Sequence, residues 1–281
     1  MNVNYNNGEI RIFSYIFQTK LHSISKDDIQ VFVINLDRTP ERYEKVKDQL
    51  RANNIKHERF SAVDGYNLEI IHKQTGDRFL GKDLKTGKTQ ILPNEHYTIS
   101  CPSADIKYFS KYFTDYNVTR TLTAGEFGCY CSHREIWNSM VLNNVKYALI
   151  LEDDITFSPN FEKKFTTLIN NLPYQWDIIY LYVATDPQKN TLTVLNNSNI
   201  KKFQADNYGI TLAAGYLINL NAAKKLFELS ENFSLAIDDL MSEHVNNKKI
   251  QAYKTSEHYL TAPVGVNPED STIFDMGRPH F

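Results

Sequence analysis

The sequence has few cysteines, no long apolar run and no excess of charge of either sign. Its three cysteines are an odd and low count for 281 residues, which argues against a disulfide scaffold and predicts reduced thiols in a cytosol-like compartment. No stretch approaches the roughly 20 apolar residues of a membrane span, and the polar N-terminus lacks a secretory signal pattern. We therefore expect a cytoplasmic protein without a transmembrane segment.

The charge balance excludes one class of partner. Lys and Arg total 31 and Asp and Glu total 33, so the formal net charge is −2 and no global basic excess favours nucleic-acid binding. Hydrophobic residues make up 42% of the chain and charged residues 23%, which is typical of a globular protein with a sizeable core.

Apolar runs that are typical of buried strands alternate with helical periodicity. The first run covers 29–36, and Thr39-Pro40 then begins a helix that reaches Ala52. Further strands are predicted at 57–63, 146–151, 176–182 and 213–218, and further helices at 123–142, 158–170, 221–229 and 238–246. This alternation predicts an α/β fold with a mostly parallel central sheet flanked by helices.

The domain organisation follows from where this pattern holds. Residues 1–28 form a polar lead-in, and 29–281 are predicted to form a single domain. The stretch 66–119 is irregular and is predicted to be an insertion within that domain. A hairpin turn is expected at 83–88.

Three acids in a row, Glu152, Asp153 and Asp154, follow the buried strand at 146–151. Adjacent carboxylates about 4 Å apart repel by roughly 1–4 kcal/mol, so a strand end would keep them only beside a cation. Mg²⁺ and Mn²⁺ prefer such oxygen ligands. Ligands of parallel sheets bind at the carboxyl ends of strands, where Asn35, Leu36 and Asp64 also fall. A plain acidic surface turn is the alternative interpretation.

The helix at 123–142 contains Cys129-x-Cys131-x-His133, which resembles a zinc motif. Residues two apart on a helix point about 200° apart, so both thiols cannot bind one ion, and we set this interpretation aside. Thr123 and Glu126 fit a capping box. His133 is alternatively a hydrogen-bonded core histidine.

The motifs together, in their order, resemble those of glycosyltransferase family 25, which holds lipooligosaccharide and collagen galactosyltransferases. The matching segments are Val33-Ile-Asn-Leu-Asp-Arg38 with Arg42, Leu122-Thr-Ala-Gly-Glu-Phe-Gly-Cys129, Ser132-His133 with Trp137, Ile150-Leu-Glu-Asp-Asp154, Trp176-Asp-Ile-Ile-Tyr180, Gly215-Tyr-Leu-Ile218, Ala223-Lys-Lys-Leu226 and Ile237-Asp-Asp239. They span roughly 31–272, apart from the insertion at 66–119, which the resemblance would place on the acceptor side.

The resemblance implies a GT-A-like nucleotide-sugar-binding fold and a metal-dependent, inverting transfer of a hexose, most often galactose, from UDP. Asp154 would be the main Mn²⁺ or Mg²⁺ ligand, with Glu152 assisting. The residues implied in nucleotide-sugar binding are Asn35, Leu36, Arg38, Arg42, Asp64, Ser132, His133, Glu152 and Asp153. Arg42 is alternatively a surface ion-pair partner of Glu41 or Asp37, and Asp64 part of a plain Asp-Gly turn.

The resemblance also implies a catalytic base on the acceptor side. Asp238 matches the position of the base that would remove the acceptor proton, and Asp239 is the second candidate. Alternatively, the two residues form a helix N-cap pair. His258 and His280 are candidates for a third metal ligand. The sequence contains Asp270-Ser271, where the family often has Ser-Asp.

The expected partners are a UDP-hexose donor and a glycan or hydroxylysine acceptor. A lipid-linked acceptor would place the protein at the inner face of a membrane. Two alternative functions remain, namely a catalytically silent relative that binds a glycan or a protein, and a metal-dependent phosphoryl-transfer enzyme. No Gly-rich phosphate loop supports the second alternative.

Overall fold

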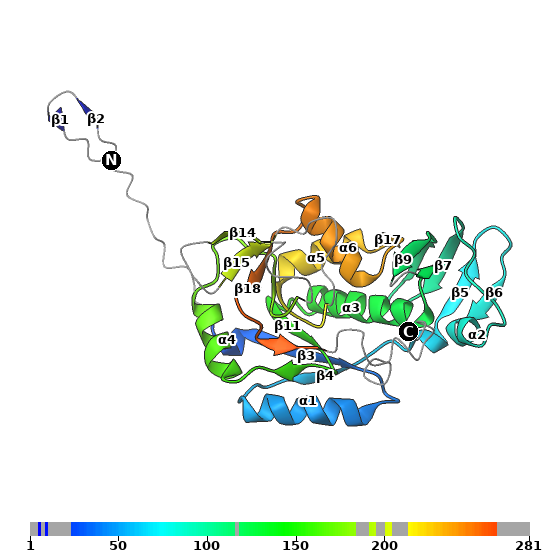
Figure 1. The fold of residues 1–281 in the computed structure, drawn as a ribbon, viewed down its shortest axis with the longest axis horizontal. Coiled ribbons are helices and arrows are strands. Elements are labelled where there is room, and N and C mark those ends of the chain that lie inside the picture. The colour runs from blue at the N-terminus through cyan, green and yellow to red at the C-terminus, as the bar shows by residue number, and fades with distance from the viewer. Residues whose placement is uncertain are drawn as a thin grey trace.

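The computed structural model describes residues 24–115, 118–183, 200–203 and 213–262, and the backbone of strands at 5–6, 9–10 and 191–194 (Figure 1). The helices are α1 (Pro40–Ala52), α2 (Gly81–Lys85), α3 (Ala124–Leu142), α4 (Phe161–Asn170), α5 (Leu220–Leu229) and α6 (Ile237–Asn246), with 3-10 turns η1 (Lys26–Asp28) and η2 (Gly65–Asn67). Within the described part of the chain, none of these helices has the length and apolarity to span a bilayer.

An eight-stranded sheet forms the centre of the molecule. Its order is β14 (Thr191–Val194), β15 (Ile200–Phe203), β18 (Ala252–Thr255), β13 (Ile178–Tyr180), β16 (Gly215–Asn219), β11 (Tyr147–Glu152), β3 (Ile29–Asn35) and β4 (Glu58–Ser61). Six strands run in one direction, whereas β15 and β16 run in the other. This mixed but mostly parallel sheet confirms the predicted α/β class.

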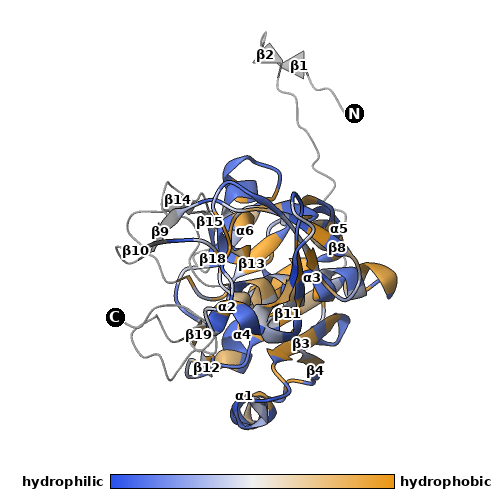
Figure 2. Cartoon of the chain, turned by 90° about the vertical axis from the view of Figure 1, so that its right-hand side faces the viewer, coloured by the Kyte–Doolittle hydropathy of each residue, from blue (hydrophilic) through white to orange (hydrophobic). Residues whose placement is uncertain are grey.

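Alternating side chains give the sheet two buried faces. From β3, Phe32 and Ile34 lie in the core that holds α3, α5 and α6, whereas Val31 and Val33 lie in the core that holds α1 and α4. The sheet is thus the middle layer between two sets of helices, as Figure 1 shows. Figure 2 shows its central strands coloured hydrophobic, which fits burial on both faces.

A second sheet lies against the opposite side of α3. Its order is β17 (Asn232–Phe233), β8 (Asp105–Phe109), β7 (His96–Ser100), β5 (Glu69–His72) and β6 (Arg78–Leu80). Ile70, Ile99 and Ile106 of this sheet belong to the same hydrophobic core as Phe127 of α3 and Ile150 of β11. The insertion therefore shares its core with the central sheet. Short antiparallel pairs complete the strands: β1 (Tyr5–Asn6) with β2 (Glu9–Ile10), β9 (Phe113–Asp115) with β10 (Val118–Arg120), and β12 (Thr156–Phe157) with β19 (Leu260–Thr261).

Several predicted elements have the expected bounds. The helix from Pro40 to Ala52 is confirmed, and α3 begins after Thr123, whose hydroxyl accepts a hydrogen bond from the Glu126 backbone in the predicted capping box. The predicted hairpin turn at 83–88 is wrong, because 81–85 form α2. The hairpin instead joins β5 to β6 and turns at Gly76, whose φ of 77° suits glycine.

Candidate functional site

The site lies where β3 and β11 end side by side. These strands are parallel, with Glu152 opposite Ile34, so the residues that follow each strand meet at one edge of the sheet. A pocket opens there between this edge and α3. It is lined by Ile34, Asn35, Leu36, Arg42, Ala62, Val63, Gly125, Cys129, Ser132, His133, Glu152, Asp153 and Asp154. Apart from the third-ligand candidates His258 and His280, twelve residues are predicted for catalysis, nucleotide-sugar or metal binding, and eight of them line this pocket.

Two glycines let the chain after β4 approach α3. A side chain at Gly65 would place its Cβ 1.8 Å from the Ala124 carbonyl oxygen, and one at Gly128 would come within 2.7 Å of the Val63 carbonyl oxygen. The Val63 backbone N–H donates to Ser132 Oγ at 2.9 Å, and the Ser132 hydroxyl donates to the Gly128 carbonyl. Ser132 thus lines the pocket, and its hydroxyl fastens α3 to this segment.

Arg42 is the cation of the acidic cluster. Its Nη2 lies 2.7 Å from Asp153 Oδ1 and 3.0 Å from Asp154 Oδ2. The interpretation of Arg42 as a partner of Glu41 or Asp37 is therefore wrong. Asn35 Nδ2 donates to Asp153 Oδ2 at 2.6 Å, and Arg59 Nε donates to Asn35 Oδ1 at 2.8 Å, which holds the amide in this orientation.

Burial is the main cause of the raised pKa values of Asp153 and Asp154. It raises the pKa of Asp153 although Arg42 opposes the shift, and it raises the pKa of Asp154 to about 7, with a further rise from the charge of Glu152. The Asp154 Oδ1 atom is buried and has no hydrogen-bond partner among the described residues. An orphaned carboxylate oxygen in a polar pocket fits an additional cation there, and oxygen ligands suit Mn²⁺ or Mg²⁺.

Glu152 turns away from the two aspartates toward α3. Its Oε1 lies 3.4 Å from His133 Nε2 and 3.9 Å from Cys129 Sγ. His133 is fully buried, as its core interpretation requires, and its Nδ1 lies 2.9 Å from the Tyr216 hydroxyl. Burial, followed by the charge of Glu152, raises the pKa of the Cys129 thiol well above its usual range, so this thiol is a poor nucleophile at neutral pH.

Four predicted site residues lie outside the pocket lining. Arg38 pairs with Asp64 (Nε to Oδ2, 3.3 Å) and lies over the Tyr66 ring, while Asp64 caps η2 by accepting from the Tyr66 backbone. Asp238 and Asp239 stand in the first turn of α6, whose N-cap is Ala236, so their interpretation as the cap is wrong. Burial is the main cause of the raised pKa values of Cys129 and Tyr180, and the charge of Asp238 adds to both, so this carboxylate lies within electrostatic range of these two groups.

Neither candidate for a third metal ligand is placed beside Asp154. His258 contacts the Tyr182 ring and lines a different pocket with Lys254 and Glu257. His280 lies outside the described residues.

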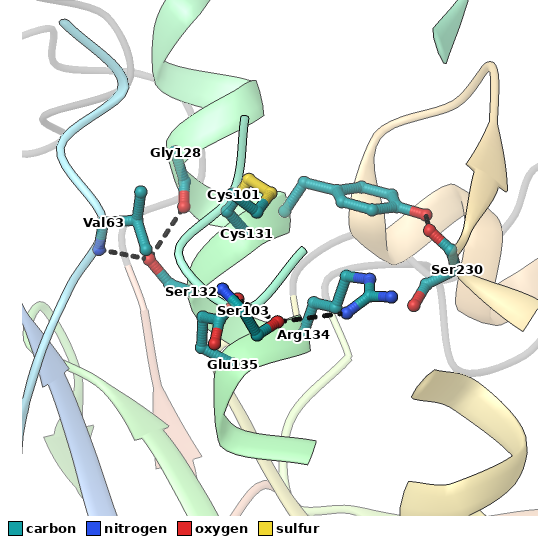
Figure 3. The surroundings of a disulfide bond; sticks show 10 residues. Val63, Cys101, Ser103, Gly128, Cys131, Ser132, Arg134, Glu135 and Ser230 are labelled. Atoms are coloured by element: carbon teal, nitrogen blue, oxygen red, sulfur yellow. Dashed lines mark hydrogen bonds between the residues drawn. A yellow bond between two sulfur atoms is a disulfide. The ribbon is translucent and has the colours of Figure 1, made fainter. Parts of the chain in front are cut away.

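The prediction of three reduced thiols is wrong in the structure. Cys101, just after β7, forms a disulfide with Cys131 of α3, with Cα atoms 5.6 Å apart, and only Cys129 is free (Figure 3). The pair could not be predicted from the cysteine count. The two residues are 30 positions apart, and they meet only because the second sheet packs on α3. Cys131 therefore faces away from the pocket, as the rejection of a Cys129–Cys131 zinc site requires.

Cys129, Arg59 and Tyr216 contact the site residues Glu152, Asn35 and His133, and none of the three was predicted from the sequence. Only Cys129 left a usable signal, because its spacing of four from His133 places both side chains on one helix face. Arg59 reaches Asn35 across the pairing of β4 with β3, and Tyr216 reaches His133 where the sheet packs on α3, and no local pattern reveals either contact.

Known proteins similar to this chain identify its family. The profile of a family described as glycosyltransferase family 25 (LPS biosynthesis protein) matches residues 28–241. A "Glycosyltransferase 25 family member" of Drosophila melanogaster is 31% identical over 200 residues, covering 70% of this chain and 27% of the relative. "Procollagen galactosyltransferase 2" of Homo sapiens is 27% identical over 238 residues, covering 82% of this chain and 32% of the relative.

An "Inactive glycosyltransferase 25 family member 3" of Homo sapiens is 31% identical over 166 residues, covering 58% of this chain and 23% of the relative. The chain thus spans about a third or less of the length of these relatives. The profile match covers most of the chain and includes both β3 and the acidic triplet. The chain belongs to glycosyltransferase family 25.

Proposed function

We propose that this protein is a metal-dependent, inverting glycosyltransferase that moves a hexose, galactose first among the candidates, from a UDP-sugar to a hydroxyl group. The observation that carries the proposal is the buried Asp154 Oδ1 at the strand edge, which has no hydrogen-bond partner among the described residues and lies in a pocket that also holds Arg42. A divalent ion on Asp154 and the neighbouring acids would neutralise the donor diphosphate and stabilise it as a leaving group.

The chain's own residues supply the other functions of such a site. Arg42 can turn its guanidinium from the aspartates to the donor phosphates, for which its planar fork is suited. Asn35 and Leu36 line the same pocket and would contact the nucleotide. Inversion needs a base on the acceptor side, and we assign the proton transfer from the acceptor hydroxyl to Asp238, with Asp239 as the second candidate.

The acceptor is proposed by class only. Relatives named procollagen galactosyltransferases support a hydroxylysine acceptor, and the family description supports a lipopolysaccharide-type glycan. A cytoplasmic location is a separate proposal. It rests on the sequence alone, and the Cys101–Cys131 disulfide, a bond that is rare in a reducing cytoplasm, argues against it. Cell fractionation would test the location.

The inactive relative supports a second candidate, a glycan- or protein-binding protein without transferase activity. A donor screen separates the two: UDP-sugars are incubated with the protein and Mn²⁺, and UDP release is measured with and without EDTA. Release of UDP from one donor that EDTA abolishes supports the transferase. Release of inorganic phosphate instead would indicate phosphoryl transfer, and no release from any donor with either acceptor class would favour the binding protein.

A further inference from the structure

The half of the pocket that faces α3 carries a second arrangement of ligand atoms. Cys129 Sγ, His133 Nε2 and a carboxylate oxygen of Glu152 all lie within 4.8 Å of one another. Cys129 and His133 are four residues apart on α3 and so share one helix face, while Glu152 closes the group from the end of β11. Two rigid elements therefore hold the three ligand atoms together.

The distances fit a tetrahedral ion of the size of Zn²⁺. Zinc binds sulfur at about 2.3 Å and nitrogen or oxygen at about 2.0–2.2 Å, which places N and O ligands about 3.4 Å apart and S and O ligands about 3.6 Å apart. The corresponding distances here are 3.4 Å from His133 to Glu152 and 3.9 Å from Cys129 to Glu152. The third pair, Cys129 and His133, lies within 4.8 Å, so its side chains would have to move closer together to reach the tetrahedral distance.

The surroundings also fit a metal ligand set. Tyr216 contacts His133 Nδ1 at 2.9 Å and accepts from Trp137 Nε1 at 3.1 Å, so it orients the imidazole with Nε2 toward Glu152. Outer-shell partners of this kind are usual for histidine ligands of metals. Zn²⁺ binding would displace the thiol proton of Cys129 to solvent, and the resulting thiolate together with the Glu152 carboxylate would cancel the two charges of the ion at this half-buried position.

We propose that Cys129, His133 and Glu152 form a binding site for a thiophilic divalent ion, Zn²⁺ in particular, that is distinct from the Asp153–Asp154 pair. The two sites differ in chemistry. The mixed sulfur, nitrogen and oxygen set selects zinc, whereas the aspartates next to Arg42 offer only oxygen. The fourth coordination position would face the pocket. The inference does not rest on the proposed transferase activity.

Zinc binding to the disulfide-intact protein tests the site directly. Competition with a chromophoric chelator should show one Zn²⁺ per chain, and Co²⁺ in its place should give a thiolate-to-cobalt charge-transfer band. Cys129→Ser should remove the band and weaken Zn²⁺ binding by more than the roughly 10–100-fold that loss of an outer-shell partner costs. Tyr216→Phe, which removes only that partner, should weaken Zn²⁺ binding by about 10–100-fold.

Asp154→Asn is the matched control, because it alters the neighbouring oxygen site and leaves all three proposed ligands. It should bind Zn²⁺ and give the cobalt band as the unaltered protein does. Zn²⁺ binding that survives in Cys129→Ser, or that is lost in Asp154→Asn alone, would overturn the proposal. Because these readouts need no sugar donor, they are independent of whether the protein transfers a hexose.

Discussion

The Arg42 guanidinium lies 3.0 Å from the Asp154 carboxylate, so the acid proposed as the metal ligand already has one cation beside it. The other oxygen of Asp154, Oδ1, is buried without a hydrogen-bond partner in the described part of the chain. One oxygen of Asp154 is thus paired with a cation, and the other has no partner among the described residues. This asymmetry predicts how the protein responds when either the acid or its cation is removed.

Asp154→Asn should abolish Mn²⁺-dependent UDP-sugar binding without destabilising the metal-free protein at neutral pH. The raised pKa of Asp154, about 7, means that the folded state binds more protons than the unfolded state between about pH 4 and pH 7. This group therefore costs stability as pH rises through that window. Relative to the unaltered protein, the variant should gain about 4 kcal/mol in unfolding free energy between pH 4 and pH 8, because a pKa shift of about three units is worth roughly 1.4 kcal/mol per unit.

Urea unfolding in EDTA at several pH values measures this difference, and calorimetric titration of UDP with Mn²⁺ measures binding. Full retention of Mn²⁺-dependent UDP binding by the variant would refute the assignment of Asp154 as metal ligand. An unchanged stability difference across the pH range would instead refute its raised pKa.

Arg42→Met should destabilise the metal-free protein, since it leaves Asp153 and Asp154 without their shared cation. Loss of one partner of a buried ion pair typically costs roughly 3–5 kcal/mol. Mn²⁺ should restore more stability to Arg42→Met than it adds to the unaltered protein, because the ion then no longer competes with a guanidinium. Unfolding with and without Mn²⁺ measures both effects, and Arg42→Lys is the charge-conserving control. If Mn²⁺ raised the unfolding free energy of both proteins equally, the ion would not compete with the Arg42 guanidinium.

Local patterns predicted much of the framework around these residues. Pro40 and the apolar spacing of Val46 and Leu50 specify α1, and Thr123 with Glu126 specifies the start of α3. The parallel strand rule also placed Asn35 and Asp153 at one edge, where they form a hydrogen bond. These features depend on short-range periodicity or on a general property of α/β sheets, so a single sequence suffices to infer them.

The remaining features depend on contacts between distant segments. The partner of Arg42 lies more than 100 residues away, and the orientation of Glu152 toward Cys129 depends on how α3 packs on β11. Neither hydrophobic periodicity nor residue spacing carries that information. In the second sheet the pairing of β8 with β17 is likewise long-range, whereas β5, β6, β7 and β8 pair with segments close to them in the sequence.

The Cys101–Cys131 disulfide should contribute measurably to stability. A loop of about this size corresponds to roughly 3–4 kcal/mol of stabilisation by the loop-entropy relation. The Cys101→Ala/Cys131→Ala double variant should be less stable by about that amount, and its unfolding should not respond to a reducing agent. Cys129→Ser, which keeps the disulfide, should respond as the unaltered protein does. Mass spectrometry that finds three alkylated cysteines in the unreduced protein would contradict the pairing.

Asp238→Asn tests the acceptor side separately from the metal side. Asp238 stands in the first turn of α6 outside the pocket lining, so the variant should bind UDP and Mn²⁺ normally. If Asp238 is the base, turnover should fall by roughly 10²–10⁴-fold with little change in donor KM. Asp239→Asn is the matched control, because it removes a neighbouring carboxylate from the same helical turn. A turnover loss confined to Asp239→Asn would transfer the role to that residue, and full activity of both variants would place the base on another element.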